Sequence, residues 1–432
     1  MTTRRKLLST AAAGGVLTAC SQGAAGTAGT AGAPTAESGP VSLVMHTRTG
    51  GDVDHFTQRA NAFHTANPTI TVNIEGTAPT EYIAKMTALQ ASNALGDAMW
   101  HTQTWIFFPF SATGGLRALD DLAKRDKYDL GQFFPNCVQQ LRWKGKLYGL
   151  PWLVHTGFSG VMVNQDVWQR LGQPVPTWDW TFRKEWLDAL QKVGRGVAAD
   201  GPDRFAMDMP FTLQGAITYL RSWGTELVSD DGKKSLLNGP KAVEALTFIH
   251  DLMNVHQVVP RPDQLVPNPF ATGKTASSNN AYFSMANLRQ QIGSSFKWQA
   301  YPMPKGPGGA RDAFLGLDNA SVTAISKHPD AAWLWARFLA TKETGVLVAR
   351  DRGSPGGRPD VWEDPSLTAD PSHQMFREWM KTVKVLPVPA NARVSDMFDA
   401  MATGLSALYL EKKSPPQAIA DLHQQLQNVL DQ

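Results

Sequence analysis

Apolar residues in the first part of the chain beyond residue 40 follow two different spacings. Residues 41–45 form a short apolar run typical of a buried strand, and residues 69–74 alternate between polar and apolar side chains, which also indicates a strand. Residues 54–66 and 81–92 instead repeat apolar positions every three or four residues, and Asn67-Pro68 ends the first of these helices. This order of strand, helix, strand and helix predicts an α/β lobe with a largely parallel sheet.

Helical spacing returns in the second half of the chain. We expect helices that begin at Gly239-Pro240 and at Pro329-Asp330, and a final amphipathic helix over residues 418–430. The stripe that the first of them buries is expected to be Val243, Leu246, Ile249 and Met253.

Tryptophan is unusually frequent, with 14 residues against 7 tyrosines. Large aromatic side chains most often fill cores, and four of them at helical positions are assigned there: Trp168, Trp186, Trp333 and Trp335. The excess still favours a site that stacks flat apolar faces, such as those of sugar rings.

The first forty residues predict export and anchoring. Arg4-Arg5-Lys6 precedes a short, weakly apolar stretch over residues 7–17, which is typical of a signal peptide and too short for a membrane span. Leu17-Thr18-Ala19-Cys20 resembles the lipobox of bacterial lipoproteins, in which the cysteine thiol takes a lipid. We therefore expect a signal peptide over 1–19, a lipid on Cys20 and a flexible Gly-, Ala- and Thr-rich tether over 20–40.

The export route has two interpretations. Residues 3–8 resemble the twin-arginine signal, with Leu7 at the position that Phe usually holds. An ordinary secretory signal that happens to contain two arginines fits these residues as well. Either route places the body outside the cytoplasm, held at the cell membrane.

The net charge of +3 belongs to the predicted signal peptide. Subtracting Arg4, Arg5 and Lys6 from 41 basic residues leaves 38, which equals the 38 acidic residues. A formally neutral chain gives no reason to expect nucleic acid as a partner. If Cys20 is lipidated, Cys137 is the remaining cysteine and no internal disulfide forms. About 390 remaining residues exceed a comfortable single domain and predict two lobes.

Nine segments of the chain carry motifs that follow one another in a fixed order: 63–68, 114–122, 145–152, 161–168, 176–180, 224–228, 270–276, 302–309 and 331–339. Residues 145–151, for example, read Gly-Lys-Leu-Tyr-Gly-Leu-Pro. In this order the segments resemble those of the maltose-binding-protein-like class of extracellular solute-binding proteins, in which the corresponding strand reads G-K-x-Y-G-L-P. Departures occur at Met162-Val163, where the class has an aromatic pair, and at Trp335, which replaces a Phe.

The resemblance implies the type II periplasmic-binding-protein fold, with two α/β lobes joined by hinge strands and a ligand cleft between them. It assigns residues 41–156 and 315–350 to lobe 1 and residues 157–314 and 351–432 to lobe 2. It also implies a monomeric, non-enzymatic component of an ABC importer. Such a protein captures a carbohydrate, here a neutral mono- or oligosaccharide, and delivers it to the permease subunits in the membrane.

Candidate ligand-binding residues follow from family position and from the chemistry of sugars, which need aromatic platforms together with hydrogen-bonding groups. The candidates are Arg48, Gln103, Trp105, Trp152, His155, Thr156, Phe211, Trp223, Phe283, Asp318, Asn319 and Arg352. Arg358 flanks the same Gly-Pro loop as Arg352 and is a further candidate for closing over the cleft.

Other chemistries are poorly supported. Gly273-Lys274-Thr275 is not a phosphate loop, because Asn268 stands where the first glycine is required. The ten histidines have no metal-ligand spacing, so we expect no metal and no cofactor. Two alternatives remain open: a lipid-anchored carbohydrate-active enzyme, and a ligand-sensing subunit of a receptor. Both would share an aromatic cleft with the binding protein.

Overall fold

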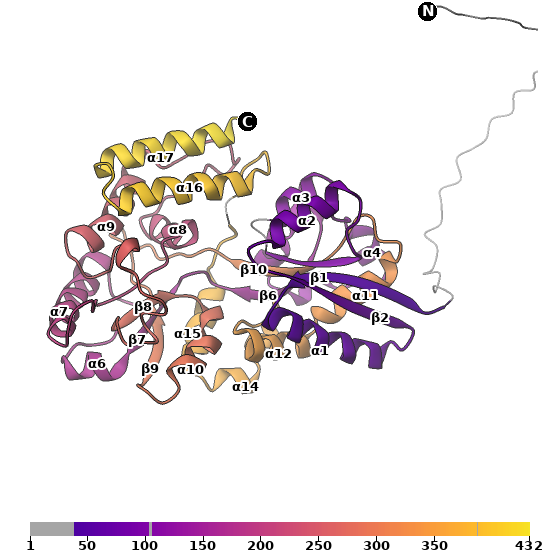
Figure 1. The fold of residues 1–432 in the computed structure, drawn as a ribbon, viewed down its shortest axis with the longest axis horizontal. Helices are drawn as coiled ribbons and strands as arrows, with labels where there is room; N and C mark the ends of the chain where they lie inside the picture. Colours follow the sequence, from indigo (N-terminus) through magenta and orange to yellow (C-terminus); the bar gives the residue numbers. More distant parts are fainter. Residues whose placement is uncertain (1–38, 103–105, 387) are drawn as a thin grey trace, which may run out of the picture. The chain divides into compact units, whose positions relative to one another are not determined.

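The computed structural model describes residues 39–102, 106–386 and 388–432 (Figure 1). The predicted signal peptide, Cys20 and all but the last two residues of the predicted tether lie outside these residues. Among the helices of the described ranges, none combines the length and the apolar character needed to cross a bilayer.

The first lobe is built on a five-stranded sheet with strand order β2-β1-β3-β10-β6. Strand β1 pairs in parallel with β2 and β3, whereas β10 pairs antiparallel with β3 and β6, so β10 alone runs against the other four. The predicted parallel pairing is confirmed for β1, β2 and β3, whereas both pairs that involve β10 are antiparallel and make the sheet mixed. The strands are β1 (Val41–Arg48), β2 (Ile70–Thr77), β3 (Ala98–Thr102), β6 (Leu150–His155) and β10 (Gly316–Val322).

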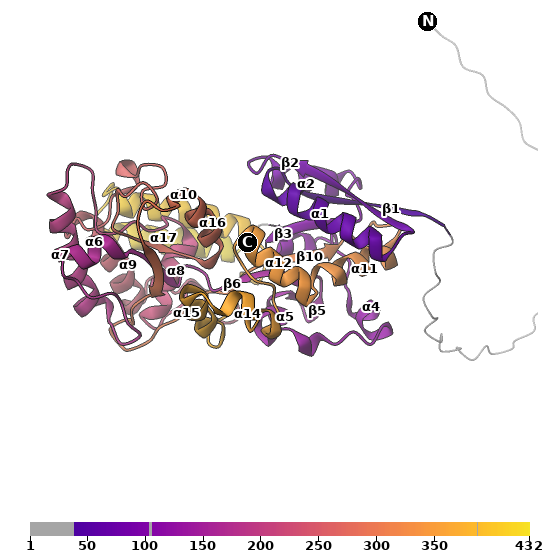
Figure 2. The ribbon, with the colours of Figure 1, turned by 90° about the horizontal axis from the view of Figure 1, so that it is seen from below.

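Helices cover both faces of this sheet (Figures 1 and 2). Helices α1 and α12 lie on one side and pack against each other, while α2 and α3 lie on the other side in Figure 1. The helices are α1 (Gly51–Ala66), α2 (Tyr82–Ala91), α3 (Phe108–Ala112), α4 (Asp120–Arg125), α5 (Pro135–Gln140), α11 (Pro329–Leu339) and α12 (Lys342–Arg352).

The second lobe contains a three-stranded sheet with order β8-β7-β9, in which β7 pairs antiparallel with both neighbours. Its strands are β7 (Gly160–Asn164), β8 (Ser277–Asn280) and β9 (Trp298–Pro302). The helices from this half of the chain are α6 (Gln165–Arg170), α7 (Leu187–Ala198), α8 (Leu213–Ser222), α9 (Pro240–Asn254), α10 (Met285–Ile292), α15 (Pro371–Met380), α16 (Val394–Tyr409) and α17 (Pro415–Leu430).

The chain crosses between the two sheets several times. β6 ends at His155 and β7 begins at Gly160, and later β9 ends at Pro302 before β10 begins at Gly316. Near these crossings, the Leu315 amide donates to the carbonyl of Lys384 over 2.7 Å. This is the two-lobed α/β arrangement of the type II fold that the resemblance implied, while the residue boundaries assigned to the lobes stay a prediction.

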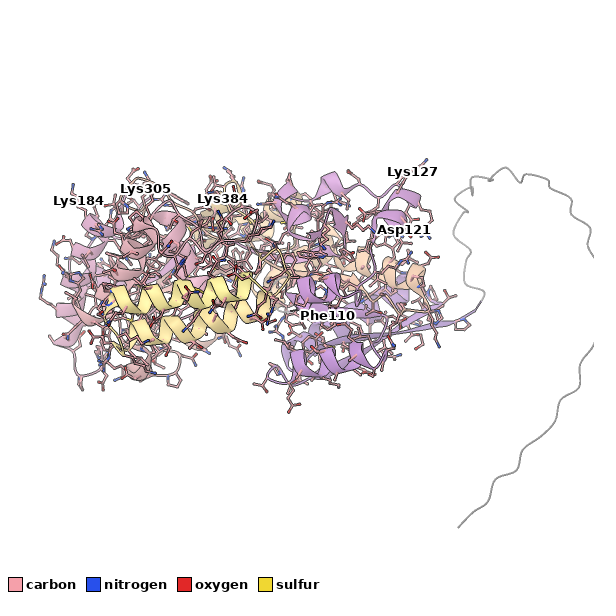
Figure 3. The ribbon with its side chains drawn as sticks, turned by 90° about the horizontal axis from the view of Figure 1, so that it is seen from above. Phe110, Asp121, Lys127, Lys184, Lys305 and Lys384 are labelled. Atoms are coloured by element: carbon pink, nitrogen blue, oxygen red, sulfur yellow. The ribbon has the colours of Figure 1, made fainter. Side chains whose placement is uncertain are left out.

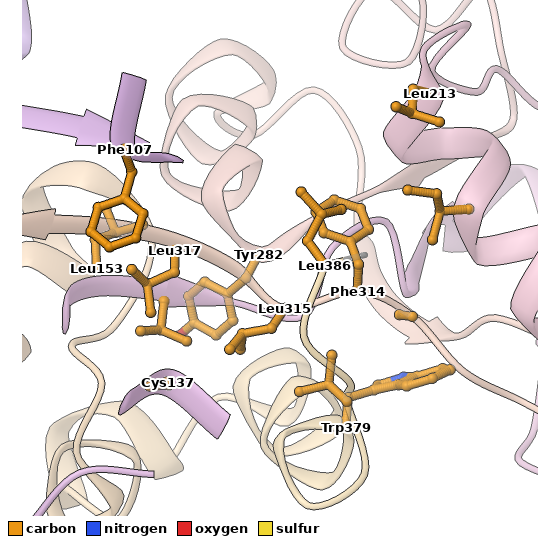
Figure 4. Close-up of a cluster of buried hydrophobic side chains, with 14 of the residues drawn as sticks. Phe107, Cys137, Leu153, Leu213, Tyr282, Phe314, Leu315, Leu317, Trp379 and Leu386 are labelled. Atoms are coloured by element: carbon orange, nitrogen blue, oxygen red, sulfur yellow. The ribbon is translucent and has the colours of Figure 1, made fainter. Parts of the chain in front are cut away.

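Buried apolar side chains form one cluster that continues across the crossings. Figure 4 shows members of this cluster side by side across the view, from Leu153 and Leu317 through Leu315 to Leu386 and Phe314. The same cluster contains Cys137, which is fully buried and free.

The periodicity predicted the elements well and their ends less well. Helix α1 begins at Gly51 rather than at 54, and α17 begins at Pro415 rather than at 418. In α9, Leu246, Ile249 and Met253 are buried as predicted, but Val243 remains partly exposed. The four tryptophans assigned to the core are all fully buried: Trp168, Trp186, Trp333 and Trp335.

Candidate ligand-binding cleft

A cavity of about 580 Å³ is lined by residues of both lobes and of the segments between them. This volume lies in the range of small-molecule binding pockets. The lining side chains are Arg48, Asp52, Trp100, Trp152, Leu153, His155, Phe158, Phe211, Thr212, Leu213, Gln214, Phe283, Phe314, Leu317, Asp318, Arg352, Phe398, Asp399 and Ala402, with Gly316 beside them.

Three charged side chains from β1, α1 and α12 meet at the cavity. Arg48 ends β1, Asp52 lies in the first turn of α1, and Arg352 ends α12. The Asp52 carboxylate binds Arg48 Nε over 2.9 Å and an Arg352 guanidinium nitrogen over 2.6 Å. The side chain of Asp52 is 5% exposed, while those of Arg48 and Arg352 are 33% and 27% exposed. One buried carboxylate therefore holds two guanidinium groups that still reach the cavity.

Asp318 lies beside these charges on β10. The Trp100 indole nitrogen donates to Asp318 Oδ2 over 3.1 Å, and the guanidinium carbon of Arg48 stands 3.8 Å from the Trp100 ring centre. Loss of solvation raises the pKa of Asp318 to about 7, although Arg48 acts in the opposite direction. The carboxyl is therefore divided between its neutral and ionised forms near neutral pH. We call Arg48, Asp52, Asp318 and Arg352 the charged wall.

Aromatic rings line another part of the cavity. His155 and Phe283 have ring centres 4.9 Å apart with planes at 73°, and Phe158 and Phe283 are 6.0 Å apart at 78°. His155 also meets Phe314 at 6.2 Å and 80°. We call these four side chains the ring corner. Burial lowers the pKa of His155 to about 4, so its ring is neutral at physiological pH.

The ring corner depends on glycine at one position. A Cβ atom added at Gly316 would stand 1.9 Å from the imidazole of His155. Because such a distance is far inside van der Waals contact, only glycine lets β10 pass the histidine ring in this arrangement.

Helices α8 and α16 complete the lining from the second lobe. The Thr212 hydroxyl caps α8 by accepting from the Gly215 amide over 3.3 Å, and Gln214 follows in the first turn. Helix α16 contributes Phe398, Asp399 and Ala402. The site thus combines ring faces with hydrogen-bonding groups. Among the described residues, no group of histidine, cysteine and carboxylate side chains is arranged to hold a metal ion.

Seven of the predicted ligand-binding residues line this cavity: Arg48, Trp152, His155, Phe211, Phe283, Asp318 and Arg352. Gln103 and Trp105 lie outside the residues that the structure describes. Arg358 is not among the lining residues and binds Asp360 over 2.7 Å.

Three predicted residues do not line this cavity. The Thr156 hydroxyl is buried and shares a hydrogen bond with Ser159 over 2.7 Å. Asn319 follows Asp318 on β10 and faces the opposite side, where its amide meets His101 Nδ1 at 2.9 Å. Trp223 is 5% exposed and packs in the core against Phe182 and Phe248, at 5.3 and 5.1 Å between ring centres.

Sequence reasoning also missed several lining residues. Trp100 lies in β3, two residues after Ala98, and side chains two residues apart in a strand point to the same face of the sheet. This alternation is a signal for Trp100 that the sequence contains. Asp52 lies at a helix start, where acidic residues are common for local reasons. Phe398 and Asp399 lie beyond residues 331–339, the last segment of the family resemblance, and no local pattern distinguished them from other residues of an amphipathic helix.

The family model for bacterial extracellular solute-binding proteins matches residues 58–375. A protein from Brucella abortus (strain 2308), named as a binding protein, is 23% identical over 411 residues, which cover 92% of this chain and 95% of that protein.

Solved structures show the same fold at low identity. An ABC substrate-binding protein from Listeria monocytogenes, in complex with cycloalternan, aligns with a TM-score of 0.81 and 18% identity over 91% of this chain and 99% of that chain. The sugar-binding protein MalE of Xanthomonas citri aligns with a TM-score of 0.78 and 21% identity over 90% and 97% of the two chains.

The architecture, the cavity between two lobes and the family match over most of the chain agree. This chain belongs to the bacterial extracellular solute-binding proteins.

Proposed function

We propose that this protein is the substrate-binding component of an ABC importer, which captures a carbohydrate and delivers it to a membrane permease. The observation that carries the proposal is the cavity itself, where ring faces from one part and paired Arg and Asp groups from another part surround the same space. Sugars combine apolar C–H faces with hydroxyl groups, and this lining offers a partner to each. The likeness to sugar-binding and ABC substrate-binding proteins supports the same conclusion.

Capture depends on contacts with both lobes. A solute that binds side chains of the two lobes at once stabilises the arrangement in which they are close. The solute contacts in this proposal are Arg48, Asp52, Trp100, Trp152, His155, Phe211, Phe283, Asp318, Arg352 and Phe398.

Anchoring at the membrane is part of the proposal. A lipid on Cys20 and the tether that follows would keep a monomeric binding protein near its permease at high effective concentration. Cys20→Ser should move the protein from the membrane fraction to the soluble extracytoplasmic fraction. Retention of this variant in the membrane fraction would disprove lipid anchoring at Cys20.

Binding is tested by thermal shift and calorimetry of the purified protein with neutral mono- and oligosaccharides. We expect at least one sugar to raise the melting temperature and to bind with one site per chain. Phe283→Ala should weaken this binding, whereas Lys184→Ala should not, because Lys184 lies on the surface outside the cavity (Figure 3). Absence of any stabilising sugar would count against the proposal.

The two alternative functions are separated by different measurements. A carbohydrate-active enzyme would release products from the bound sugar, which product analysis over hours detects. A receptor subunit would bind sugar without supporting its entry into cells, so uptake of labelled sugar by cells that lack the protein distinguishes it from a transport component.

A further inference from the structure

The two sides of the cavity offer a solute different chemistry. The charged wall presents two guanidinium groups and two carboxyl groups from β1, α1, β10 and α12. The ring corner presents three phenyl rings and a neutral imidazole, which come from the end of β6, from the segments that join the two sheets and from the turn that follows β8. A ligand that is polar on all sides would leave its hydroxyl groups against phenyl rings, where hydrogen bonds to water are lost without replacement.

The rings of the corner pack against one another, which limits how a sugar ring can stack on them. A sugar ring that stacks on an aromatic platform needs one open face, or several faces that are nearly parallel. In the ring corner the planes of neighbouring rings stand at 73°, 78°, 80° and 57° to one another, with ring centres 4.9 to 6.4 Å apart. At these distances the rings touch, and the edge of one ring covers part of the face of the next. The corner therefore offers a sugar ring little open face and presents an apolar surface that an alkyl or aryl group can lie against.

The corner is accessible to a ligand. Phe283 is 41% exposed, which is unusual for a phenylalanine and leaves apolar surface in contact with water. Covering that surface with an apolar group is favourable, because it removes apolar area from water on both partners.

The charge around the corner argues against a cationic group. Aromatic rings also attract cations such as quaternary ammonium groups, usually with a carboxylate nearby. The Asp52 carboxylate of this cavity is already paired with Arg48 and Arg352, and Asp318 accepts a hydrogen bond from Trp100. A cation placed in this corner would lose its hydration and would compete with two guanidinium groups for Asp52.

We propose that the solute is a sugar that carries an uncharged apolar substituent, such as an alkyl or aryl aglycone, with its hydroxyl groups at the charged wall and the substituent in the ring corner. This inference rests on the proposed carbohydrate-binding function and names the class of carbohydrate.

The test compares methyl and phenyl glycosides of glucose, galactose, mannose and xylose, in both anomeric forms, by calorimetry on the purified protein. For at least one sugar and anomer, the phenyl glycoside should bind about tenfold or more tightly than the methyl glycoside, as apolar pockets discriminate. Phe283→Ala should remove most of this preference. Trp178→Ala is the matched control, since Trp178 is 38% exposed and does not line the cavity, and it should leave the preference unchanged.

Three results would overturn the inference. If every phenyl glycoside binds no more tightly than the methyl glycoside of the same sugar and anomer, the corner does not hold an apolar group. Binding of the methyl glycosides or of free sugars would still leave the proposed function intact. Tighter binding of phenyltrimethylammonium than of any phenyl glycoside would identify the corner as a cation site. Failure of every glycoside and every free sugar to bind would refute both proposals.

Discussion

At the scale of single residues, Asp52 is the residue on which the charged wall depends. It is nearly buried and pairs with two guanidinium groups, at 2.9 and 2.6 Å. Asp52→Asn would leave two neighbouring positive charges without their shared partner. Because breaking a buried ion pair from one side costs several kcal/mol, we expect the free energy of unfolding to fall by about 2–4 kcal/mol, measured by urea denaturation.

Asp121→Asn provides the matched control for Asp52. Asp121 also binds an arginine four residues away, Arg117, over 2.6 Å, but its side chain is 64% exposed (Figure 3). Exposed ion pairs of this kind contribute little to stability, so the free energy of unfolding of Asp121→Asn should fall by less than about 1 kcal/mol. Similar losses in the two variants would show that burial of Asp52 does not strengthen its pairs.

Asp318 should make stability depend on pH. Its pKa is raised to about 7 in the folded protein, while an unfolded aspartate has a pKa near 4. At a pH between these two pKa values, Asp318 is ionised in the unfolded chain and mostly neutral in the folded protein. The contribution of Asp318 to stability is therefore present at low pH and is lost as the pH rises towards 7. Relative to wild type, Asp318→Asn should gain stability between pH 4 and pH 7, by roughly 4 kcal/mol at most, and should gain nothing further above pH 7.

The measurement for Asp318 is the free energy of unfolding of wild type and Asp318→Asn at pH 5, 6, 7 and 8. Using the difference between the two proteins removes the contribution of other titrating groups. A difference that is constant across this range would contradict the raised pKa.

At the scale of helices and strands, the sequence was informative where the signal is local. The alternation at residues 69–74 and the repeats at 54–66 correctly predicted β2 and α1, because burial of one face determines both patterns. Helical repeats do not say which neighbour covers that face. Trp223, which directly follows α8, therefore looked like a cleft residue and lies in the core instead. In α16 the opposite happened, because Phe398 and Asp399 line the cavity but were not predicted to do so. Helix α16 begins more than 230 residues after β6 ends, so no local pattern connects the two.

The role of α16 leads to a prediction at this scale. Ala402 lines the cavity and is exposed, so a tryptophan at this position can project into the space without disturbing the core. Ala402→Trp should weaken sugar binding about tenfold or more, by occupying the site, and should leave the melting temperature nearly unchanged. Calorimetry and thermal denaturation check the two parts of this prediction.

Thr403→Trp is the matched control on the same helix. Thr403 is exposed and does not line the cavity, so the added indole should have no effect on affinity. Equal losses of affinity in both variants would show that the effect comes from the helix as a whole and not from filling the cavity.

At the scale of the whole molecule, binding depends on how the two lobes meet. Helix α12 packs on α1 and β6 of the first lobe, and it ends at Arg352, which lines the cavity. The next residue, Gly353, has a φ of +79°, and a Cβ atom there would stand 2.6 Å from the carbonyl oxygen of Phe283. Since Phe283 also lines the cavity, this close approach holds two cavity residues from distant parts of the chain beside each other.

Gly353→Ala should therefore weaken sugar binding by about tenfold as well as lower stability. The methyl group forces α12 and Phe283 apart, which separates contacts that a single solute must make at the same time. Gly114→Ala separates this effect from backbone strain, because Gly114 has the same φ of +79° but nothing within 4 Å of its Cβ position. Both variants should lose about 1–2 kcal/mol of stability from the left-handed conformation. Calorimetry should then show a loss of affinity in Gly353→Ala alone, and unchanged affinity in Gly353→Ala would mean that this approach plays no part in binding.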